Sequence, residues 1–246
     1  MHIEVLPSAG TTLLPYLVDK LVIIIDVLRA TSTMVTALAN GCQAIVPVIT
    51  PEEALEKRLM IPGALLGGER QALSIEGFDL GNSPFDYVPE IVGGKRVIMT
   101  TTNGTRAIRA CNEAPYVWMA SFLNLQSIVQ AVHRKFEENS ELVGIIIFCA
   151  GTEERFDLPD TLCAGMLIDA LGSDVVLNDL GVAARMLYKV NEDNIIETIL
   201  HADHAQKLVS LGFEDDVIYC ATSNILPIVP VLVQDEIVWL TEETRG

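Results

Sequence analysis

Two loops of this chain place chemically reactive side chains beside a predicted helix start. In the first, Asp26 and Arg29 follow the apolar run Leu21–Ile25 and precede three consecutive hydroxyl residues, Thr31, Ser32 and Thr33. A helix start has unpaired N–H groups and the positive end of the helix dipole, so it favours anions. A carboxylate at such a place suggests a metal ligand or a nucleophile. A helix cap needs only one hydroxyl, so this combination favours phosphate chemistry over capping alone.

The second loop has the same character. Thr100 ends an apolar segment and is followed by a polar run that consists of Thr101, Thr102, Asn103, Gly104, Thr105 and Arg106. Threonine is common in strands and Asn-Gly is a turn signal, so part of this pattern has a purely structural explanation. Arg106 adds a planar donor that suits phosphate, carboxylate or sulfonate. We therefore expect this loop to bind an anion.

Three further segments contain candidate residues for which a purely structural role is a stronger alternative to ligand binding than in the two loops. Glu69 and Arg70 follow two glycines that permit close approach of a ligand, although a surface turn with a weak ion pair would look the same. Asn82 lies in a turn-rich stretch, and Asp160 belongs to a group of carboxylates that could bind Mg²⁺ or favour a helix start. Asp157 is placed to cap a helix that starts at Pro159.

Two other residue types favour structural interpretations. Cys149 ends an apolar strand and is expected to be inert core. His201 and His204 are three residues apart, which favours a solvated helix surface over a metal site.

Composition limits the partners. The chain has 246 residues, half of them hydrophobic, and a net charge of −17, which argues against binding nucleic acid or an anionic membrane surface. Five cysteines without a C-x-x-C pair argue against disulfides and structural zinc. The N-terminal residues contain no basic segment followed by an apolar one, so we expect no signal peptide and a cytoplasmic location. The apolar, acidic composition is compatible with a homodimer.

The remaining pattern predicts alternating strands and helices. Strands are expected at Ile3–Leu6, Leu21–Ile25, Ala44–Val48, Ala64–Leu66, Val97–Met99, Tyr116–Met119, Val143–Phe148 and Ile228–Val233. Helices are expected at Thr33–Asn40, Pro51–Leu59, Gly104–Cys111, Leu125–Phe136, Pro159–Leu171, Asp179–Val190 and Ala202–Leu211. This order predicts a three-layer α/β/α fold with a mixed, mostly parallel sheet, and such sheets bind ligands at the carboxyl ends of their strands.

We interpret residues 1–246 as a single α/β domain whose part from about residue 171 is rich in helix. Within it, the segments that begin at Val22 and Val97 look alike, since each has a strand, a polar loop and a helix. The hypothesis is that these are two similar units whose helix starts face one site, although two ordinary units of an α/β sheet would look much the same.

Several long motifs, in this order, resemble the 2-phosphosulfolactate phosphatase family of coenzyme M biosynthesis. The carriers are Asp26–Thr33, Leu66–Arg70, Gly77–Pro84, Thr100–Arg106, Ser121–Asn124, Cys149–Gly151 and Asp160–Gly165. The resemblance implies a Mg²⁺-dependent phosphatase that hydrolyses 2-phospho-3-sulfolactate to 3-sulfolactate and phosphate. Pro159 departs from the family pattern, where a glutamate is expected, and Glu153 and Glu154 replace a more glycine-like stretch.

The resemblance and the residues together give a set of expected roles. The catalytic residues are expected to be Asp26, Arg29 and Arg106, and Mg²⁺ is expected on Asp26 with help from Glu69 or Asp160. The substrate-binding residues are expected to be Thr31, Ser32, Thr33, Arg70, Asn82, Thr101, Thr102, Asn103, Gly104, Thr105 and Asn124. Asp26 could be the nucleophile or could hold the metal and its water.

Two alternative functions remain open at this point. The first is a phosphatase of another phosphorylated hydroxy acid, because Pro159 and its neighbours could line the pocket. The second is a non-catalytic binder of anionic metabolites, which would need arginines and helix ends but no carboxylate cluster.

Overall fold

The structure is a computed structural model that describes residues 1–8, 17–153 and 155–241. Its strands are β1 (His2–Leu6), β2 (Lys20–Ile25), β3 (Ala44–Pro47), β4 (Leu65–Arg70), β5 (Leu73–Ser74), β6 (Arg96–Thr100), β7 (Tyr116–Ala120), β8 (Gly144–Cys149), β9 (Val176–Leu177), β10 (Pro230–Val233) and β11 (Glu236–Trp239). Its helices are α1 (Ala30–Ala39), α2 (Pro51–Met60), α3 (Pro89–Val92), α4 (Gly104–Ala110), α5 (Leu125–Glu138), α6 (Leu158–Leu171), α7 (Asp179–Asn191), α8 (Ile195–Leu200), α9 (Asp203–Ser210) and α10 (Glu214–Cys220), with 3₁₀ turns η2 (Pro84–Asp86) and η3 (Phe122–Asn124).

Within the described residues the strands form one mixed sheet, in the order β5-β4-β6-β3-β11-β10-β7-β2-β8-β1-β9. Strands β4, β6 and β3 are parallel to one another, and so are β7, β2, β8, β1 and β9. The antiparallel hairpin β10–β11 joins the two sets. The predicted fold class, a mixed and mostly parallel sheet between helices, is confirmed.

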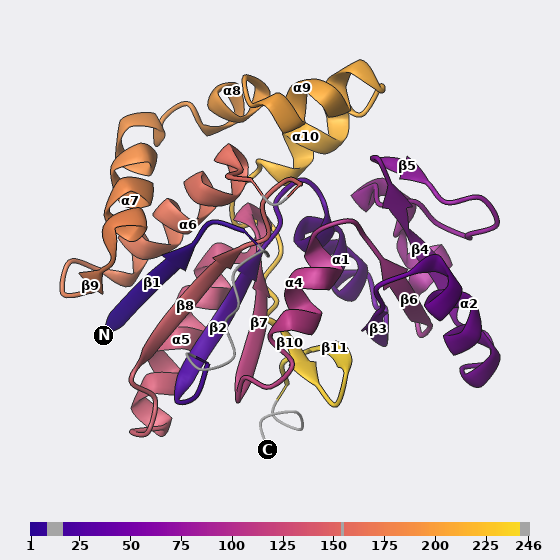
Figure 1. The fold of residues 1–246 in the computed structure, drawn as a ribbon, viewed down its shortest axis with the longest axis horizontal. Coiled ribbons are helices and arrows are strands. Elements are labelled where there is room, and N and C mark those ends of the chain that lie inside the picture. The colour runs from indigo at the N-terminus through magenta and orange to yellow at the C-terminus, as the bar shows by residue number, and fades with distance from the viewer. Residues whose placement is uncertain (9–16, 154, 242–246) are drawn as a thin grey trace.

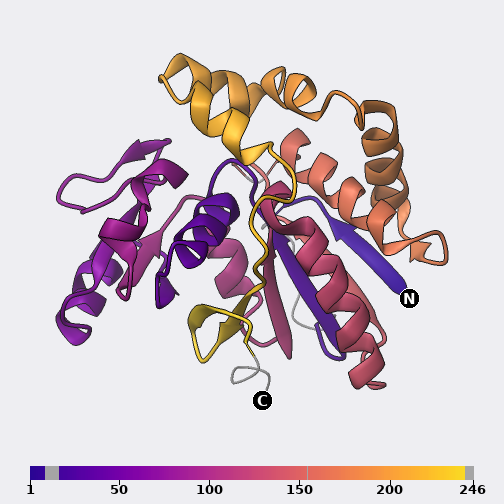
Figure 2. The ribbon, with the colours of Figure 1, turned by 180° about the vertical axis from the view of Figure 1, so that it is seen from behind.

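Helices cover both faces of the sheet because its strands are apolar on both sides (Figure 1). On β2, Val22 and Ile24 pack with α1 and α4, whereas Leu21, Ile23 and Ile25 pack with α5 and α6. Figure 2 shows α5 in front of the sheet when the molecule is seen from behind. These alternating contacts make the three layers.

The hairpin reverses the direction of one parallel set relative to the other. Because three antiparallel pairings separate β7 from β3, strand β6 runs opposite to β2 along the sheet. Neighbouring strands twist by about 20–25°, so the five steps from β2 to β6 accumulate roughly 100° of rotation. Despite their opposite directions, β2 and β6 end in loops that line one cavity.

The chain beyond residue 171 is mainly helical, and α8, α9 and α10 lie across one end of the sheet (Figure 1). Short elements were not predicted: the strands β5, β9 and β11 and the helices α3, α8 and α10. No helix in the described part of the chain is long and apolar enough to cross a membrane.

Two local predictions need correction. The glycine segment after Leu66 is part of β4, which continues to Arg70, and Gly68 lies so close to β6 that a Cβ there would overlap the carbonyl of Thr100. His201 and His204 do not share a helix, since His201 caps the end of α8 and His204 belongs to α9. The predicted cap is confirmed, because the side chain of Asp157 accepts a hydrogen bond from the N–H of Asp160 at the start of α6.

Candidate active site

A cavity of about 180 Å³ lies where the loops after β2 and β6 meet the C-terminal helices. It is lined by Asp26, Leu28, Arg29, Glu69, Arg70, Gln71, Ala72, Asn82, Thr101, Thr102, Asn103, Thr152, Glu153, His204, Lys207 and Leu208. Eight of these were predicted from sequence as site residues: Asp26, Arg29, Glu69, Arg70, Asn82, Thr101, Thr102 and Asn103. The structure therefore brings both predicted loops to one cavity.

Asp26 is held by the first turn of α1. Its N–H donates to Thr31 Oγ1 (3.0 Å), and that hydroxyl donates back to the Asp26 carbonyl (2.8 Å). The N–H of Ala30 donates to Asp26 Oδ1 at 3.1 Å. Asp26 Oδ2 accepts no hydrogen bond from the described residues and lies 2.8 Å from the point that a Cβ on Gly104 would occupy. One carboxylate oxygen is thus fixed, and the other is left for a ligand.

The surroundings of Asp26 disfavour its negative charge. The pKa of Asp26 is raised from 3.8 to about 7, chiefly by burial and in smaller part by the charges of Asp157 and Glu69. The charge of His204 and the hydrogen bond from Ala30 oppose this rise in pKa. A bound cation would stabilise the ionised carboxylate.

The loop after β6 repeats the arrangement around Asp26. The N–H of Thr101 donates to Thr105 Oγ1 (3.1 Å), and that hydroxyl donates to the Thr101 carbonyl (3.0 Å). The next N–H, of Thr102, donates to Glu69 Oε1 at 2.8 Å, and the N–H of Ala72 donates to Glu69 Oε2 at 2.8 Å. Glu69 therefore ties this loop to the turn between β4 and β5.

Three cationic side chains line the cavity, namely Arg29, Arg70 and Lys207. Arg29 is buried: its Nη1 donates to Asp216 Oδ2 of α10 (2.6 Å), and its Nη2 donates to the carbonyl of Ala72 (2.7 Å). Arg70 donates to the carbonyl of Ile49 and to Thr100 Oγ1, both at 2.9 Å. The two guanidinium groups are thus fixed in place before any ligand arrives.

Several predicted binding residues lie behind the cavity wall. The hydroxyls of Thr31, Ser32 and Thr33 are buried, and each donates to a backbone carbonyl, those of Asp26, Val27 and Asn82 respectively. Gly104 and Thr105 are buried between the two loops. The amide of Asn124 is also buried and donates to the carbonyls of Met119 and Ile228. These residues shape the loops and do not face the cavity.

Two predicted charged residues are also absent from the cavity lining. Arg106 is exposed on α4. Asp160 is buried, and its two oxygens accept the N–H groups of Val27 (2.8 Å) and Gly151 (3.1 Å). Burial and the charges of Asp157 and Asp26 raise the pKa of Asp160. In this arrangement Asp160 joins the loop after β2 to the loop after β8.

Five polar residues of the cavity lining were not predicted as site residues: Gln71, Thr152, Glu153, His204 and Lys207. His204 and Lys207 are three apart on α9, which is one helical turn, so both face the same side. That spacing was one available signal, and the match of His204 to a histidine of the resembled family was another, but a solvated surface helix has the same spacing. Only the packing of α9 over the sheet distinguishes a helix that lines the site from a solvated surface helix.

The donor set fits Mg²⁺ bound together with a substrate phosphate. Asp26 Oδ2 has no hydrogen-bond donor among the described residues. The buried Asn82 Oδ1, from another residue that lines the cavity, has none either. Mg²⁺ commonly uses one or two protein carboxylates and takes its other ligands from water and phosphate. No group of three or more His, Cys, Asp or Glu in the described residues could hold a metal ion without such help.

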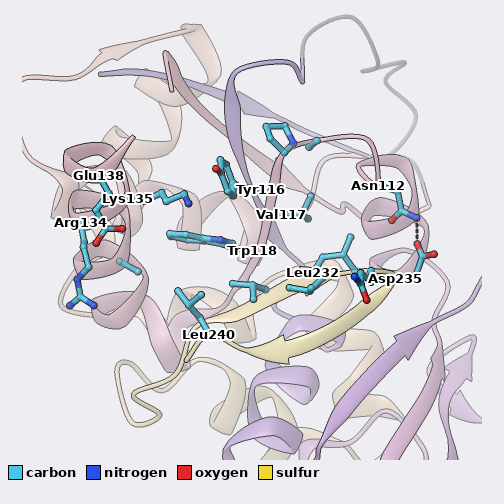
Figure 3. A pocket seen from close by; sticks show the side chains of 16 residues that line it. Asn112, Tyr116, Val117, Trp118, Arg134, Lys135, Glu138, Leu232, Asp235 and Leu240 are labelled. Carbon is cyan, nitrogen blue, oxygen red and sulfur yellow. Dashed lines mark hydrogen bonds between the residues drawn. The ribbon is translucent and has the colours of Figure 1, made fainter. Parts of the chain in front are cut away.

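A larger cavity, of about 420 Å³, lies at the amino end of β7 beside the β10–β11 hairpin (Figure 3). Trp118, Tyr116 and Leu240 give it an apolar lining, and the ammonium of Lys135 lies 3.7 Å from the centre of the Tyr116 ring. None of the residues predicted from sequence lines it. The smaller cavity is therefore the candidate active site.

Comparison with known proteins gives a family match over most of the chain. The family model for 2-phosphosulpholactate phosphatase matches residues 12–235. A protein of Symbiobacterium thermophilum is 41% identical over 91% of this chain and 96% of its own length. One of Clostridium perfringens is 43% identical over 93% and 92%, and one of Thermotoga petrophila is 45% identical over 86% and 88%. Each is named as a probable 2-phosphosulfolactate phosphatase.

Proposed function

Because the chain belongs to the 2-phosphosulpholactate phosphatase family, and is therefore a phosphoric monoester hydrolase, we propose that it hydrolyses 2-phospho-3-sulfolactate with the help of Mg²⁺. The products are 3-sulfolactate and phosphate. The observation that carries this proposal is the cavity in which Asp26 meets three cationic side chains of an otherwise acidic protein.

The charges of the cavity suit the proposed substrate, which has a phosphate, a carboxylate and a sulfonate. Arg29, Arg70 and Lys207 supply three positive charges at one place in a chain of net charge −17. Fixed guanidinium groups suit planar or tetrahedral oxyanions because they offer paired donors. We assign Arg29, the arginine nearest in sequence to Asp26, to the phosphate, and Arg70, Lys207 and the Nδ2 group of Asn82 to the sulfonate and carboxylate.

Asp26 is the residue to which we assign contact with the phosphoryl group. Asp26 Oδ2 and Asn82 Oδ1 would hold Mg²⁺, which supplies charge neutralisation on the phosphoryl oxygens. Asp26 itself either attacks phosphorus or orients the attacking water. Rapid acid quenching with a substrate labelled on phosphorus separates the two routes, because only attack by Asp26 leaves the label on the protein.

The first test is phosphate release from 2-phosphosulfolactate, phospholactate and phosphoglycolate, each measured with and without Mg²⁺. Release that needs Mg²⁺ and prefers the sulfonate supports the proposal. Equal release from all three substrates keeps the phosphatase and rejects the sulfonate preference. Absence of release from every substrate rejects the proposal and favours a binder of anionic metabolites.

A further inference from the structure

His204 is the one imidazole that lines the candidate active site, within the described residues. It reaches the cavity from α9, far along the chain from Asp26. Its Nδ1 lies 2.9 Å from Thr152 Oγ1 and 3.3 Å from Asp157 Oδ2. The ring is therefore held from one side by two residues of the segment that follows β8.

The hydrogen bonds around Thr152 determine which ring nitrogen carries a proton. The Thr152 hydroxyl donates its hydrogen to Asp157 Oδ2 at 2.7 Å, so its oxygen can only accept from His204. The Asp157 carboxylate is also an acceptor. Both partners of Nδ1 therefore require a hydrogen on Nδ1. Nε2, which has no hydrogen-bond partner among the described residues, is the nitrogen available for a substrate.

Asp157 is well placed to hold the imidazole. Its carboxylate is buried, its Oδ1 accepts the N–H of Asp160 at the start of α6, and its Oδ2 accepts from Thr152. A fixed carboxylate behind one nitrogen orients the ring. The imidazole is also within electrostatic reach of the reacting centre, since its charge lowers the pKa of Asp26.

Resting on the proposed function, we propose that His204 is the catalytic acid that protonates the leaving alcohol from Nε2, with Asp157 and Thr152 as positioning residues. The bond from phosphorus to the bridging ester oxygen breaks, and that oxygen takes the proton of Nε2. A bond from phosphorus to a water oxygen forms, either directly or after transfer through Asp26. One proton released by that water returns to Nε2, and the other stays with the products, so the balance is ester plus water to alcohol plus hydrogen phosphate.

The chemistry of the substrate explains why such an acid is needed. The leaving group of a phosphorylated hydroxy acid is an alkoxide, which leaves poorly unless it is protonated, and general acid catalysis contributes typically about 10²–10⁴-fold. An aryl phosphate such as p-nitrophenyl phosphate releases a stable phenolate and needs little help. The ratio of activities on the two substrates therefore reports on the acid.

The test compares wild type, His204→Ala and His201→Ala on 2-phosphosulfolactate and on p-nitrophenyl phosphate. His201 is the matched control because it is an exposed histidine nearby on the chain that does not line the site cavity. We expect H204A to lower kcat on the sulfonate substrate by about 10²-fold or more, with KM changed by less than about threefold. We expect less than about tenfold loss on the aryl phosphate and no change for H201A.

A kcat of H204A within about fivefold of wild type on the sulfonate substrate would overturn the inference, and so would equal losses on the two substrates. If wild type does not hydrolyse the aryl phosphate, the kcat of H204A on the sulfonate substrate decides alone. Circular dichroism confirms that each variant is folded. Failure of the proposed function is distinct, because wild type itself would then release no phosphate.

Asp157→Asn tests the positioning role, because an amide keeps a cap for α6 but is a weaker acceptor than the carboxylate for the hydrogen on His204 Nδ1. We expect a smaller loss than for H204A with the same preference for the sulfonate substrate. A loss that is equal on both substrates would indicate a purely structural role for Asp157 and reject its positioning role.

Discussion

The two strand–loop–helix units of this protein have the same local geometry and different chemical content. In each, a threonine hydroxyl on the first turn of the helix receives a backbone N–H and donates to the carbonyl of the same residue, Asp26 in the β2 unit and Thr101 in the β6 unit. The spacing is five residues in the first unit and four in the second. The hypothesis of two similar units that face one site agrees with this arrangement, since Asp26 and Thr101 line the same cavity.

The difference lies in what the repeated arrangement presents. The β2 unit presents a buried carboxylate whose pKa is raised to about 7, whereas the β6 unit presents an uncharged threonine and fixes Glu69 through the N–H of Thr102. The β2 unit is therefore suited to take part in the reaction, and the β6 unit is suited to hold the other residues of the site in place. The predictions below test this division.

The largest effect is expected for Asp26→Asn. The amide keeps the size of the side chain but removes the charge that we assign to metal binding or attack, so kcat should fall on the order of 10⁴-fold, a typical scale for loss of a central catalytic group. Steady-state phosphate release measures this. Thr101→Ser is the matched variant in the other unit, and we expect it to retain activity within about threefold. Near-normal turnover of D26N would contradict the role of Asp26.

Gly104→Ala tests the contact between the two units. A Cβ on residue 104 would lie 2.5 Å from Ala30 Cβ and 2.8 Å from Asp26 Oδ2, so the loops must separate. We expect a loss of about 1–3 kcal/mol in the free energy of unfolding, typical of overpacking, together with a loss of kcat. Urea denaturation and phosphate release measure the two effects. Ala30→Gly in the same chain should restore part of both, and additive effects of the two changes would contradict the contact.

Thr31→Val and Thr105→Val compare the two hydroxyls directly. Each change removes a hydroxyl that accepts a buried N–H, so each should lower the free energy of unfolding by about 1–3 kcal/mol. We expect T31V to lower kcat more than T105V, because only Thr31 holds the residue that carries the charge. Equal losses of kcat would show that the β6 unit matters as much for chemistry as the β2 unit.

The remaining effect is expected in the pH dependence of stability. Since burial raises the pKa of Asp26 from 3.8 to about 7, the folded protein keeps this proton at pH values where the unfolded chain has lost it. The free energy of unfolding contributed by Asp26 should therefore fall as the pH rises from about 4 to about 7. Thermal unfolding without divalent cations, at several pH values, should give a flatter profile for D26N than for wild type. Identical profiles would contradict the raised pKa.

Sequence reasoning located the parts of the site that lie within continuous motifs. Asp26, Arg29 and the run Thr101–Asn103 follow apolar strands, and polar residues that follow the strands of an α/β sheet are candidates for a ligand site. It misplaced the hydroxyls of Thr31–Thr33, which share the motif but lie behind the cavity wall. A linear motif does not say which of its side chains point inward, because backbone carbonyls compete for hydroxyl donors.

The sequence by itself determined the alternation of strands and helices, the apolar strands covered on both faces, and the polar loops at their ends, because these depend on local periodicity and on local turn chemistry. The tertiary structure alone decided that the hairpin β10–β11 separates two oppositely running sets of strands and that the loops after β2 and β6 nevertheless line one cavity. It also decided that α9 brings His204 and Lys207 to Asp26. Contacts between residues so far apart along the chain depend on packing, which no local pattern encodes.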